Sequence, residues 1–305
     1  LHYFSVSRYI YFYAFIYLFA TLTSLAKGAS FLGGILTVCF ILFSIVFANA
    51  IETKRQLYVI LFLFVCIGVL VSFYGFYQFM FPTKFSGVWH DVDMFASISF
   101  RVYSTLENPN VLGEYFLLVL PFSAALCINS KSVFNRLFFA ACGGIMLLCL
   151  VLTYSRGCYI GIMGAVAVFL VLWDRRFIFL GIVILLLLPF ILPDTIINRF
   201  LSIGNMDDSS TSYRVYIWLG TLAMLKDYWL CGIGPGTDAF NQVYPAYAYN
   251  GISAPHSHNL FLQVTCDAGI VGLIIFVLLI FQYYRMTCGA LSREQKKENK
   301  VLLIA

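Results

Sequence analysis

Two of the chain's four histidines, His256 and His258, stand in the segment SAPHSHNLFLQ, directly before one of the most apolar runs of the sequence. An imidazole that stays neutral can take a proton from a hydroxyl and act as a general base. A helix N-terminus and neighbouring cations both favour the neutral ring over the imidazolium. We therefore predict that His258 is a base. The plainer alternative is that it caps the following helix or contacts lipid headgroups.

Three arginines could bring positive charge to the same chemistry. Arg156 interrupts the nearly unbroken apolar stretch LLCLVLTYSRGCYIGIMGAVAVFL, where a charge costs about 2.5–3.5 kcal/mol at mid-membrane. Arg214 is expected in the first turn of a helix, where a bound anion would offset its conflict with the helix dipole. Arg101, in ISFRVYSTLENPN, is the third. A guanidinium binds phosphate through two parallel hydrogen bonds, so these residues could hold a diphosphate. Snorkelling of Arg156 and solvent exposure of Arg214 are the alternatives.

The sequence offers little support for a metal or a cofactor. His256 and His258 form an H-x-H pair, but no third ligand follows at a recognised spacing and there is no H-E-x-x-H. The segment GIGPGT lacks the G-K-[ST] of a nucleotide-binding loop and is typical of a turn. We expect no metal and no cofactor. Asp267 lies about 14 Å further along the expected helix. It pairs with an arginine, marks a polar cavity or lies at the membrane interface, and the sequence does not choose among these.

The composition indicates the kind of protein that must position these groups. Hydrophobic residues make up 61% of the 305 residues and charged residues only 11%, whereas a soluble domain has roughly a quarter charged. This predicts an all-α polytopic membrane protein. The net charge of +5 is small and spread out, so we expect no nucleic-acid partner. Nine cysteines without a C-x-x-C pair give no disulfide framework.

A membrane span needs about 20 apolar residues. We predict a single integral membrane domain over residues 1–305, with two long polar interruptions at 81–108 and 193–257. The predicted spans lie near 9–26, 29–50, 57–80, 109–129, 136–154, 157–173, 177–192 and 258–282, and another begins at 301. The chain begins at Leu1 and stops inside the apolar VLLIA, so we expect a fragment of a longer chain.

Lys and Arg in the short loops set the expected orientation. They are Lys54, Arg55, Lys131, Arg136, Arg175 and Arg176, followed after residue 282 by Arg285, Arg293, Lys296, Lys297 and Lys300. All fall on one side of the predicted spans, which we assign to the cytoplasm, so both long interruptions lie outside. Within the second, Ser and Thr precede apolar residues at helical spacing, which predicts a helix at 211–228 on the outer membrane face.

This topology turns the N-termini of the spans beginning at 109, 157 and 258 toward the outside. Helix N-termini present unpaired N–H groups and partial positive charge, which suit anions. We therefore predict Asn108, Asn110 and Asn259 as substrate-binding residues beside the arginines. The alternative is that asparagine and serine here only cap their helices.

The motifs FRVYSTLENPN, TYSRGCYIG, SYRVYIW, GIGPGT and HSHNLFLQVTCDAGIVG occur in an order that resembles the O-antigen ligase and O-antigen polymerase superfamily. His258-Asn259, nine residues and Gly269 match the H-N-x9-G pattern of that family. His256 does not match it, because Asp267 stands where the glycine would be. The resemblance covers roughly residues 100–280.

The resemblance implies a GT-C-like helical bundle with a large extracytoplasmic loop, in the cytoplasmic (inner) membrane of a bacterium. The implied activity is metal-independent, inverting transfer of a glycan from undecaprenyl diphosphate to an acceptor hydroxyl on the extracytoplasmic face. By motif match, Arg156 and Arg214 bind the diphosphate and His258 activates the acceptor. The implied partners are the lipid-linked glycan donor, a glycan or lipid acceptor, and membrane lipids. One departure is that eight full spans are predicted here, whereas family members usually have ten or more.

Three alternative functions differ from this one. A polymerase that adds repeat units to a lipid-linked glycan would carry the same residues as a ligase. A transporter or flippase of lipid-linked glycans would often show internal repeats and broken helices, neither of which the sequence suggests. A structural anchor explains neither Arg156 nor the long external loops.

Overall fold

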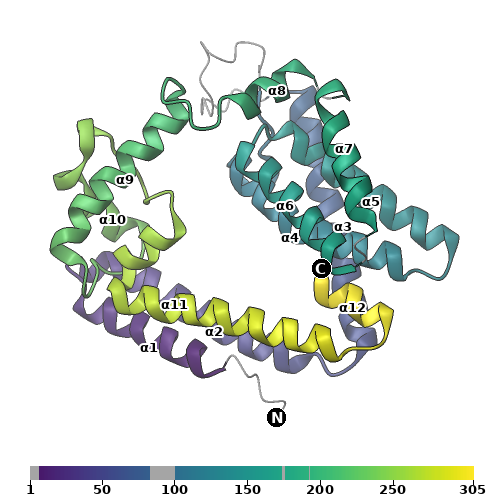
Figure 1. Cartoon of the computed structure of the whole chain (residues 1–305). Helices are drawn as coiled ribbons and strands as arrows, with labels where there is room; N and C mark the ends of the chain where they lie inside the picture. The colour runs from purple at the N-terminus through teal and green to yellow at the C-terminus, as the bar shows by residue number, and fades with distance from the viewer. Residues whose placement is uncertain (1–6, 83–99, 174–175, 192) are drawn as a thin grey trace. The chain divides into compact units, whose positions relative to one another are not determined.

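The computed structural model describes residues 7–82, 100–173, 176–191 and 193–305 (Figure 1). The described residues form helices and no strand, which confirms the all-α class. The α-helices are α1 (Ser7–Thr23), α2 (Lys27–Ala50), α3 (Lys54–Met80), α4 (Pro109–Asn129), α5 (Val133–Leu152), α6 (Arg156–Trp173), α7 (Phe177–Ile191), α8 (Asp194–Leu201), α9 (Ser209–Tyr228), α10 (Thr237–Val243), α11 (Leu260–Arg293) and α12 (Lys297–Ile304). Three short 3-10 helices join them: η1 (Ser104–Leu106), η2 (Tyr244–Tyr247) and η3 (Tyr249–Gly251).

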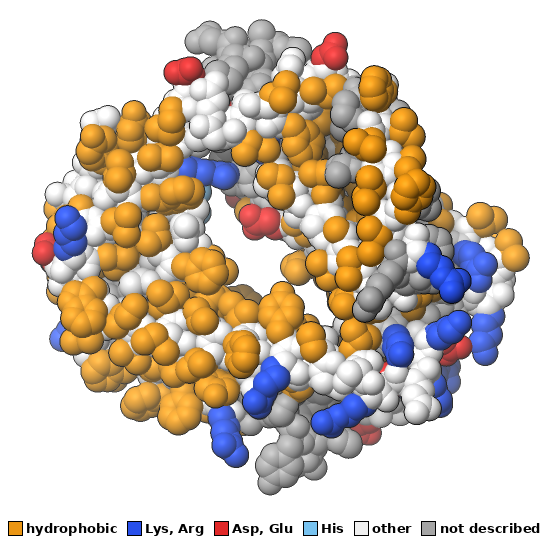
Figure 2. Space-filling view, in the orientation of Figure 1, with side chains coloured by type: hydrophobic (Ala, Val, Ile, Leu, Met, Phe, Trp, Pro, Cys, Tyr) orange, Lys and Arg blue, Asp and Glu red, His pale blue; other side chains and the backbone are white. Residues whose placement is uncertain are grey.

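Six of the described helices, α2, α3, α4, α5, α6 and α11, are long and apolar enough to cross a membrane. Their surfaces carry many exposed large side chains, such as Phe31, Phe40 and Phe43 on α2, which are more than 60% exposed. Hydrophobic side chains accordingly cover most of the visible face in Figure 2. Such surfaces need lipid around them, so the chain is a multi-pass membrane protein. With 17 and 15 residues, α1 and α7 are shorter than these six helices. The number of eight spans therefore stays a prediction.

The helices pack into two compact units. Unit 1 comprises Leu1–Glu52 and Ser209–Gly289, and therefore holds α1, α2, α9, α10 and most of α11. Unit 2 comprises Thr53–Asp208 and Ala290–Ala305, with the remaining helices. The sequence predicted one membrane domain, and candidate spans occur in both units. His258 and Arg214 belong to unit 1, whereas Arg156 and Arg101 belong to unit 2.

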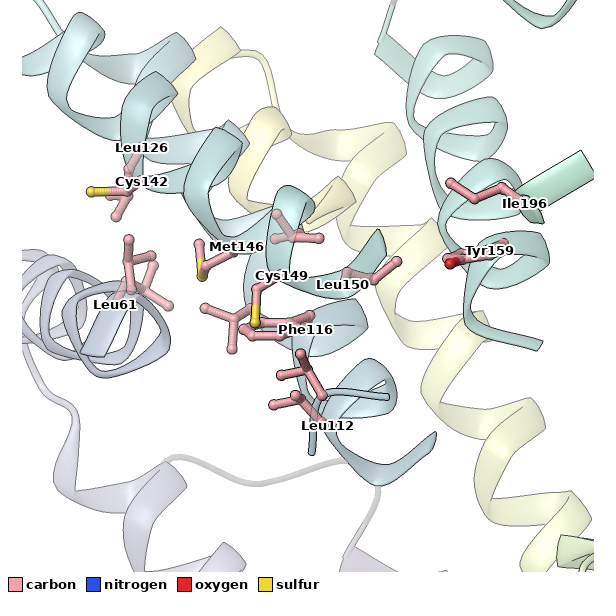
Figure 3. Close-up of a cluster of buried hydrophobic side chains, with 14 residues drawn as sticks. Leu61, Leu112, Phe116, Leu126, Cys142, Met146, Cys149, Leu150, Tyr159 and Ile196 are labelled. Carbon is pink, nitrogen blue, oxygen red and sulfur yellow. The ribbon is translucent and has the colours of Figure 1, made fainter. Parts of the chain in front are cut away.

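The core of unit 2 lies among α3, α4 and α5, with Tyr159 of α6 and Ile196 of α8 at its margin (Figure 3). Phe116 and Met146 are fully buried there. Close packing depends on small residues. A Cβ atom added at Gly68 of α3 would approach the Met146 sulfur to 2.5 Å. Aliphatic side chains and sulfur atoms thus fill the space between the helices.

The ends of the unit 2 helices differ in their polar residues. The loop between α4 and α5 and the start of α3 border a cleft of about 600 Å³ whose lining includes Arg55 and Lys131. Lys and Arg side chains gather around the nearby ends of α5 and α12 in Figure 2. Arg101 and Arg156 lie instead at the beginnings of α4 and α6. Within unit 2, Arg55 and Lys131 therefore lie at the opposite helix ends from Arg101 and Arg156. The cytoplasmic assignment stays a prediction.

In unit 1, α11 is broken at Gly269, whose φ of 68° and ψ of −172° are not helical. The segment after α9 fills the break with backbone hydrogen bonds. Ile233 N–H donates to Cys266 O at 2.6 Å, and Ile270 N–H donates to Trp229 O at 2.8 Å. In a continuous helix Ile270 would donate to Cys266 instead. The inserted segment thus satisfies both groups, as buried backbone requires. Our expectation that no helix is broken is wrong.

Other predicted boundaries changed in detail. The helix predicted at 211–228 is α9, and because it begins at Ser209, Arg214 lies in its second turn rather than its first. The helix predicted from 258 begins at Leu260 and continues to Arg293. The one predicted from 301 begins at Lys297. Arg175 and residues 83–99 of the first expected external loop lie outside the described residues.

Candidate active site

His258 lies in the last turn of the loop before α11, with a left-handed backbone at φ 51°. It is not the helix cap. Asn259 has that role, because its Oδ1 accepts hydrogen bonds from Phe261 N–H at 3.0 Å and Leu262 N–H at 3.2 Å. The cap alternative for His258 is therefore wrong, and its imidazole is left for other contacts. The predicted substrate-binding role of Asn259 would have to use its Nδ2 group.

Two rings border the His258 imidazole. The His256 ring centroid is 4.0 Å away, and the Tyr213 ring of α9 meets it edge to face at 5.8 Å. The Tyr213 hydroxyl donates to Ser253 O at 3.0 Å. This bond links α9 to residues 253–259, the loop that carries His256 and His258 and is called the histidine loop below. Tyr213 was not among the predicted site residues, although it directly precedes Arg214 in the motif SYRVYIW.

The surroundings of His258 favour its neutral form. Burial is the main cause, and the positive charges of His256 and Arg214 add to it, so the pKa of His258 falls from 6.5 to about 4. Burial also lowers the pKa of His256. The sequence analysis attributed the neutral ring to a helix N-terminus and to arginines. The structure confirms one arginine, Arg214, and adds desolvation as the larger effect. At neutral pH the ring can accept a proton.

Arg214 lies on α9 with an exposed side chain. Its charge acts on His258, so unit 1 brings together an uncharged imidazole and a guanidinium from segments more than 40 residues apart. A guanidinium in this place can bind an anionic group while the neighbouring ring receives a proton.

Arg156 begins α6 and forms an ion pair with Asp208, whose side chain is fully buried. The same Nη1 atom also donates to Ser202 O at 3.1 Å and to Ser202 Oγ at 2.7 Å. Its side chain is 13% exposed, so the arginine does not simply snorkel. Within the described residues Arg156 bonds only through Nη1. Its role in binding an anion stays a prediction.

Arg101, Asn108 and Asn110 form a structural cluster at the start of α4. Arg101 is 5% exposed, donates from Nε to Thr153 O at 2.7 Å and from Nη2 to Asn110 Oδ1 at 3.0 Å. Asn108 Oδ1 caps α4 by accepting from Asn110 N–H at 2.8 Å. These contacts link the loop before α4 to the end of α5. They favour the capping alternative for Asn108, and the substrate-binding role of the three residues stays a prediction.

Replacing Asp208 with asparagine is expected to destabilise unit 2. Removing one partner of a buried ion pair costs about 3–5 kcal/mol, and the partial exposure of Arg156 favours the lower end of this range. The neighbouring Asp207 is exposed, so Asp207→Asn is the matched control. Thermal unfolding of the two purified variants measures the effect. Equal midpoints for both variants would show that Asp208 is not a stabilising partner of Arg156.

Among the described residues, no group of three His, Cys, Asp or Glu side chains is arranged to hold a metal ion. The residues brought together around His258 are His256, Tyr213 and Arg214. Asp208 and Gln263, which contact Arg156 and the histidine loop, were not predicted, because nothing in their local sequence distinguishes them.

Comparison with known proteins identifies the family of the chain. The family model described as O-antigen ligase matches residues 116–277, which is more than half of the chain and includes Arg156, Arg214 and His258. No curated protein and no solved structure matches the chain. The chain therefore belongs to the O-antigen ligase family.

Proposed function

We propose that this membrane protein transfers a glycan from undecaprenyl diphosphate to an acceptor hydroxyl on the extracytoplasmic face of the bacterial inner membrane, without a metal or other cofactor. The family supports glycan transfer of the O-antigen ligase or polymerase type. The observation that carries the finer proposal is the contact of the His258 imidazole with the Tyr213 ring, directly before Arg214 in the sequence, in surroundings that lower the pKa of the imidazole. A neutral imidazole can activate a hydroxyl, and a guanidinium can stabilise a departing diphosphate.

In the proposed reaction, the acceptor oxygen forms a bond to the anomeric carbon as the bond from that carbon to the phosphate oxygen breaks. The bonding electrons leave with the lipid diphosphate, and the acceptor proton passes to His258. Arg214 would offset the charge that develops on the leaving diphosphate, and the role of Arg156 in binding it stays a prediction from the motif match. Preorganised charges of this kind contribute several kcal/mol to catalysis in other enzymes.

Reconstitution tests the proposal. The purified full chain in lipid vesicles would receive an undecaprenyl-diphosphate glycan and candidate acceptors, with and without EDTA. We expect released lipid diphosphate together with a glycan on the acceptor, and the same yield with EDTA. A longer glycan on the lipid carrier would identify a polymerase instead of a ligase. Movement of the intact lipid-linked glycan across the bilayer without diphosphate release would identify a transporter and contradict the proposal.

The pH dependence of transfer should follow His258. Because its pKa is about 4, the ring is neutral above that value, and the rate should stay level from neutral pH down to about pH 5 and fall below it. Arg214→Gln removes a charge that lowers this pKa, so the acid limb of the profile should move upward, toward 6.5. Lys226→Gln, on the same helix, is the control. An acid limb unmoved by Arg214→Gln would contradict the role of His258 as the titrating base.

A further inference from the structure

The loop that carries His258 is held by a side chain one turn into α11. Ser257 N–H donates to Gln263 Oε1 at 2.8 Å, and the Ser257 side chain is tied in turn to Asn259 O at 2.9 Å. Ser257 is fully buried. A left-handed backbone at a non-glycine residue is uncommon and needs support from its surroundings. The Gln263 contact at the adjoining residue gives His258 that support.

The orientation of the Gln263 carboxamide is fixed from its other end. Its Nε2 donates to Asp267 Oδ1 at 2.8 Å. A carboxamide has one accepting and one donating side. Because Asp267 accepts, the nitrogen must face it, and the oxygen must then face Ser257. Asp267 therefore sets the direction in which Gln263 holds the loop.

Asp267 is itself anchored by α1 and by the backbone N–H of Gly236, which precedes α10. Its Oδ2 accepts from the Tyr17 hydroxyl at 3.3 Å, and Tyr17 accepts from the Tyr13 hydroxyl at 3.0 Å. Tyr17 is 4% exposed and packs with Ala268 of α11. At 3.3 Å the tyrosine–carboxyl bond is longer than the usual 2.5–3.0 Å, so Tyr17 contributes less than Gln263. The arginine partner considered in the sequence is not among these contacts, and the polar cavity and the interfacial position stay predictions.

We propose that Gln263 and Asp267 are positioning residues for His258, acting through the Ser257 backbone. The inference rests on the proposed function, because it assigns what holds the base of that site in place. Neither side chain has a contact with the His258 ring among the described residues, so neither is a candidate for the proton transfer itself. Misplacement of a catalytic group by about 1 Å can cost on the order of 10²-fold in rate.

An exchange of the two polar groups tests the inference. In Gln263→Glu two carboxyl groups face each other, which breaks the link, and we expect kcat to fall about 10- to 100-fold with the donor KM little changed. Asp267→Asn keeps an oxygen for Gln263 and should be milder. In the double variant Q263E/D267N, the new carboxylate at position 263 accepts from Ser257 N–H and from the new carboxamide at position 267. The oxygen of that carboxamide accepts from Tyr17. All three hydrogen bonds return, and kcat should recover to within a few-fold of the parent protein.

Hydrogen exchange of peptides covering residues 253–259 gives a readout that does not depend on activity. Exchange at Ser257 should be slow in the parent protein and in the double variant, fast in Gln263→Glu, and slightly faster in Tyr17→Phe. Gln282→Leu is the matched control, since Gln282 lies on the same helix and has no side-chain hydrogen bond among the described residues.

The outcomes separate this inference from the proposed function. If Gln263→Glu changes the exchange at Ser257 but not kcat, the positioning role is overturned. The proposed role of His258 as the base would then still stand. Restored exchange in the double variant, in a protein whose His258→Ala variant is fully active, would show that the link exists but that the proposed function is wrong. If Gln263→Glu does not fold, recovery of folding and kcat in the double variant supports the inference. Failure of both variants, with unchanged exchange in Tyr17→Phe, contradicts it.

Discussion

Replacing His258 with alanine is expected to lower the rate of glycan transfer about 10²- to 10⁴-fold, the usual contribution of a positioned general base. The ring is buried enough to be neutral at physiological pH, with its pKa lowered to about 4. Without it the acceptor hydroxyl, whose proton is hard to remove, must react unassisted or through water. The donor KM should change little, because the arginines proposed to bind the diphosphate remain.

His256→Ala is the natural control for this variant. The His256 ring lies 4.0 Å from that of His258, but His256 falls outside the H-N-x9-G pattern. We expect a small loss of activity and an upward shift of the His258 pKa, since the charge of His256 lowers it. Release of lipid diphosphate by both variants, at matched amounts of folded protein, is the measurement. Full activity of His258→Ala would remove this residue from the mechanism.

The membrane class and most helices of this chain follow directly from hydropathy, because a bilayer forces its spanning segments to satisfy their own backbone. The helix α9 was also predictable, since Ser and Thr precede its apolar pattern. The candidate base and Arg214 were identified from residue type and context, and unit 1 brings them together. Features that depend on local sequence could therefore be predicted. They include the length of a helix, its polarity and its capping residues.

Side-chain partners from distant segments could not be predicted from the sequence. Arg156 was recognisable as a charge in an apolar run, but Asp208, which pairs with it, lies 52 residues away in a segment with no local signal. Asp267 was recognisable as an acidic residue in an apolar helix, but Tyr17 is 250 residues away. Side-chain pairing across such separations is decided by tertiary packing, which a single sequence does not encode in its local pattern.

The position of Gly269 could be predicted from the sequence, but its structural role could not. The H-N-x9-G pattern marks the position, but only the structure gives the reason. Its backbone conformation is one that only glycine adopts readily, and the segment after α9 passes directly over it. A Cβ atom there would lie 1.9 Å from Leu230 O and 2.8 Å from Cys231 N. The glycine is therefore required by close backbone approach rather than by contact with a substrate.

Gly269→Ala is consequently expected to prevent unit 1 from reaching its native fold. The unfavourable backbone alone costs about 1–3 kcal/mol. The clash must also move the Leu230 segment away, which breaks the bonds of Ile233 N–H to Cys266 O and Ile270 N–H to Trp229 O. Each buried backbone group left without a partner adds about 1–3 kcal/mol. Together these terms are comparable to the whole stability of a typical domain.

The matched control is Gly289→Ala on the same helix, where an added Cβ meets nothing within 4 Å and alanine favours the helix by up to about 1 kcal/mol. The yield of monodisperse protein after extraction, and its thermal midpoint, should fall sharply for Gly269→Ala alone. One other folded state is available to this variant, because in a straight α11 Ile270 N–H would donate to Cys266 O. Hydrogen exchange would then rise at residues 229–233, and the displaced helix start would take the His258 loop with it, so folded protein would be inactive. Folded, active Gly269→Ala with unchanged exchange would show that the break in α11 is not what holds unit 1 together.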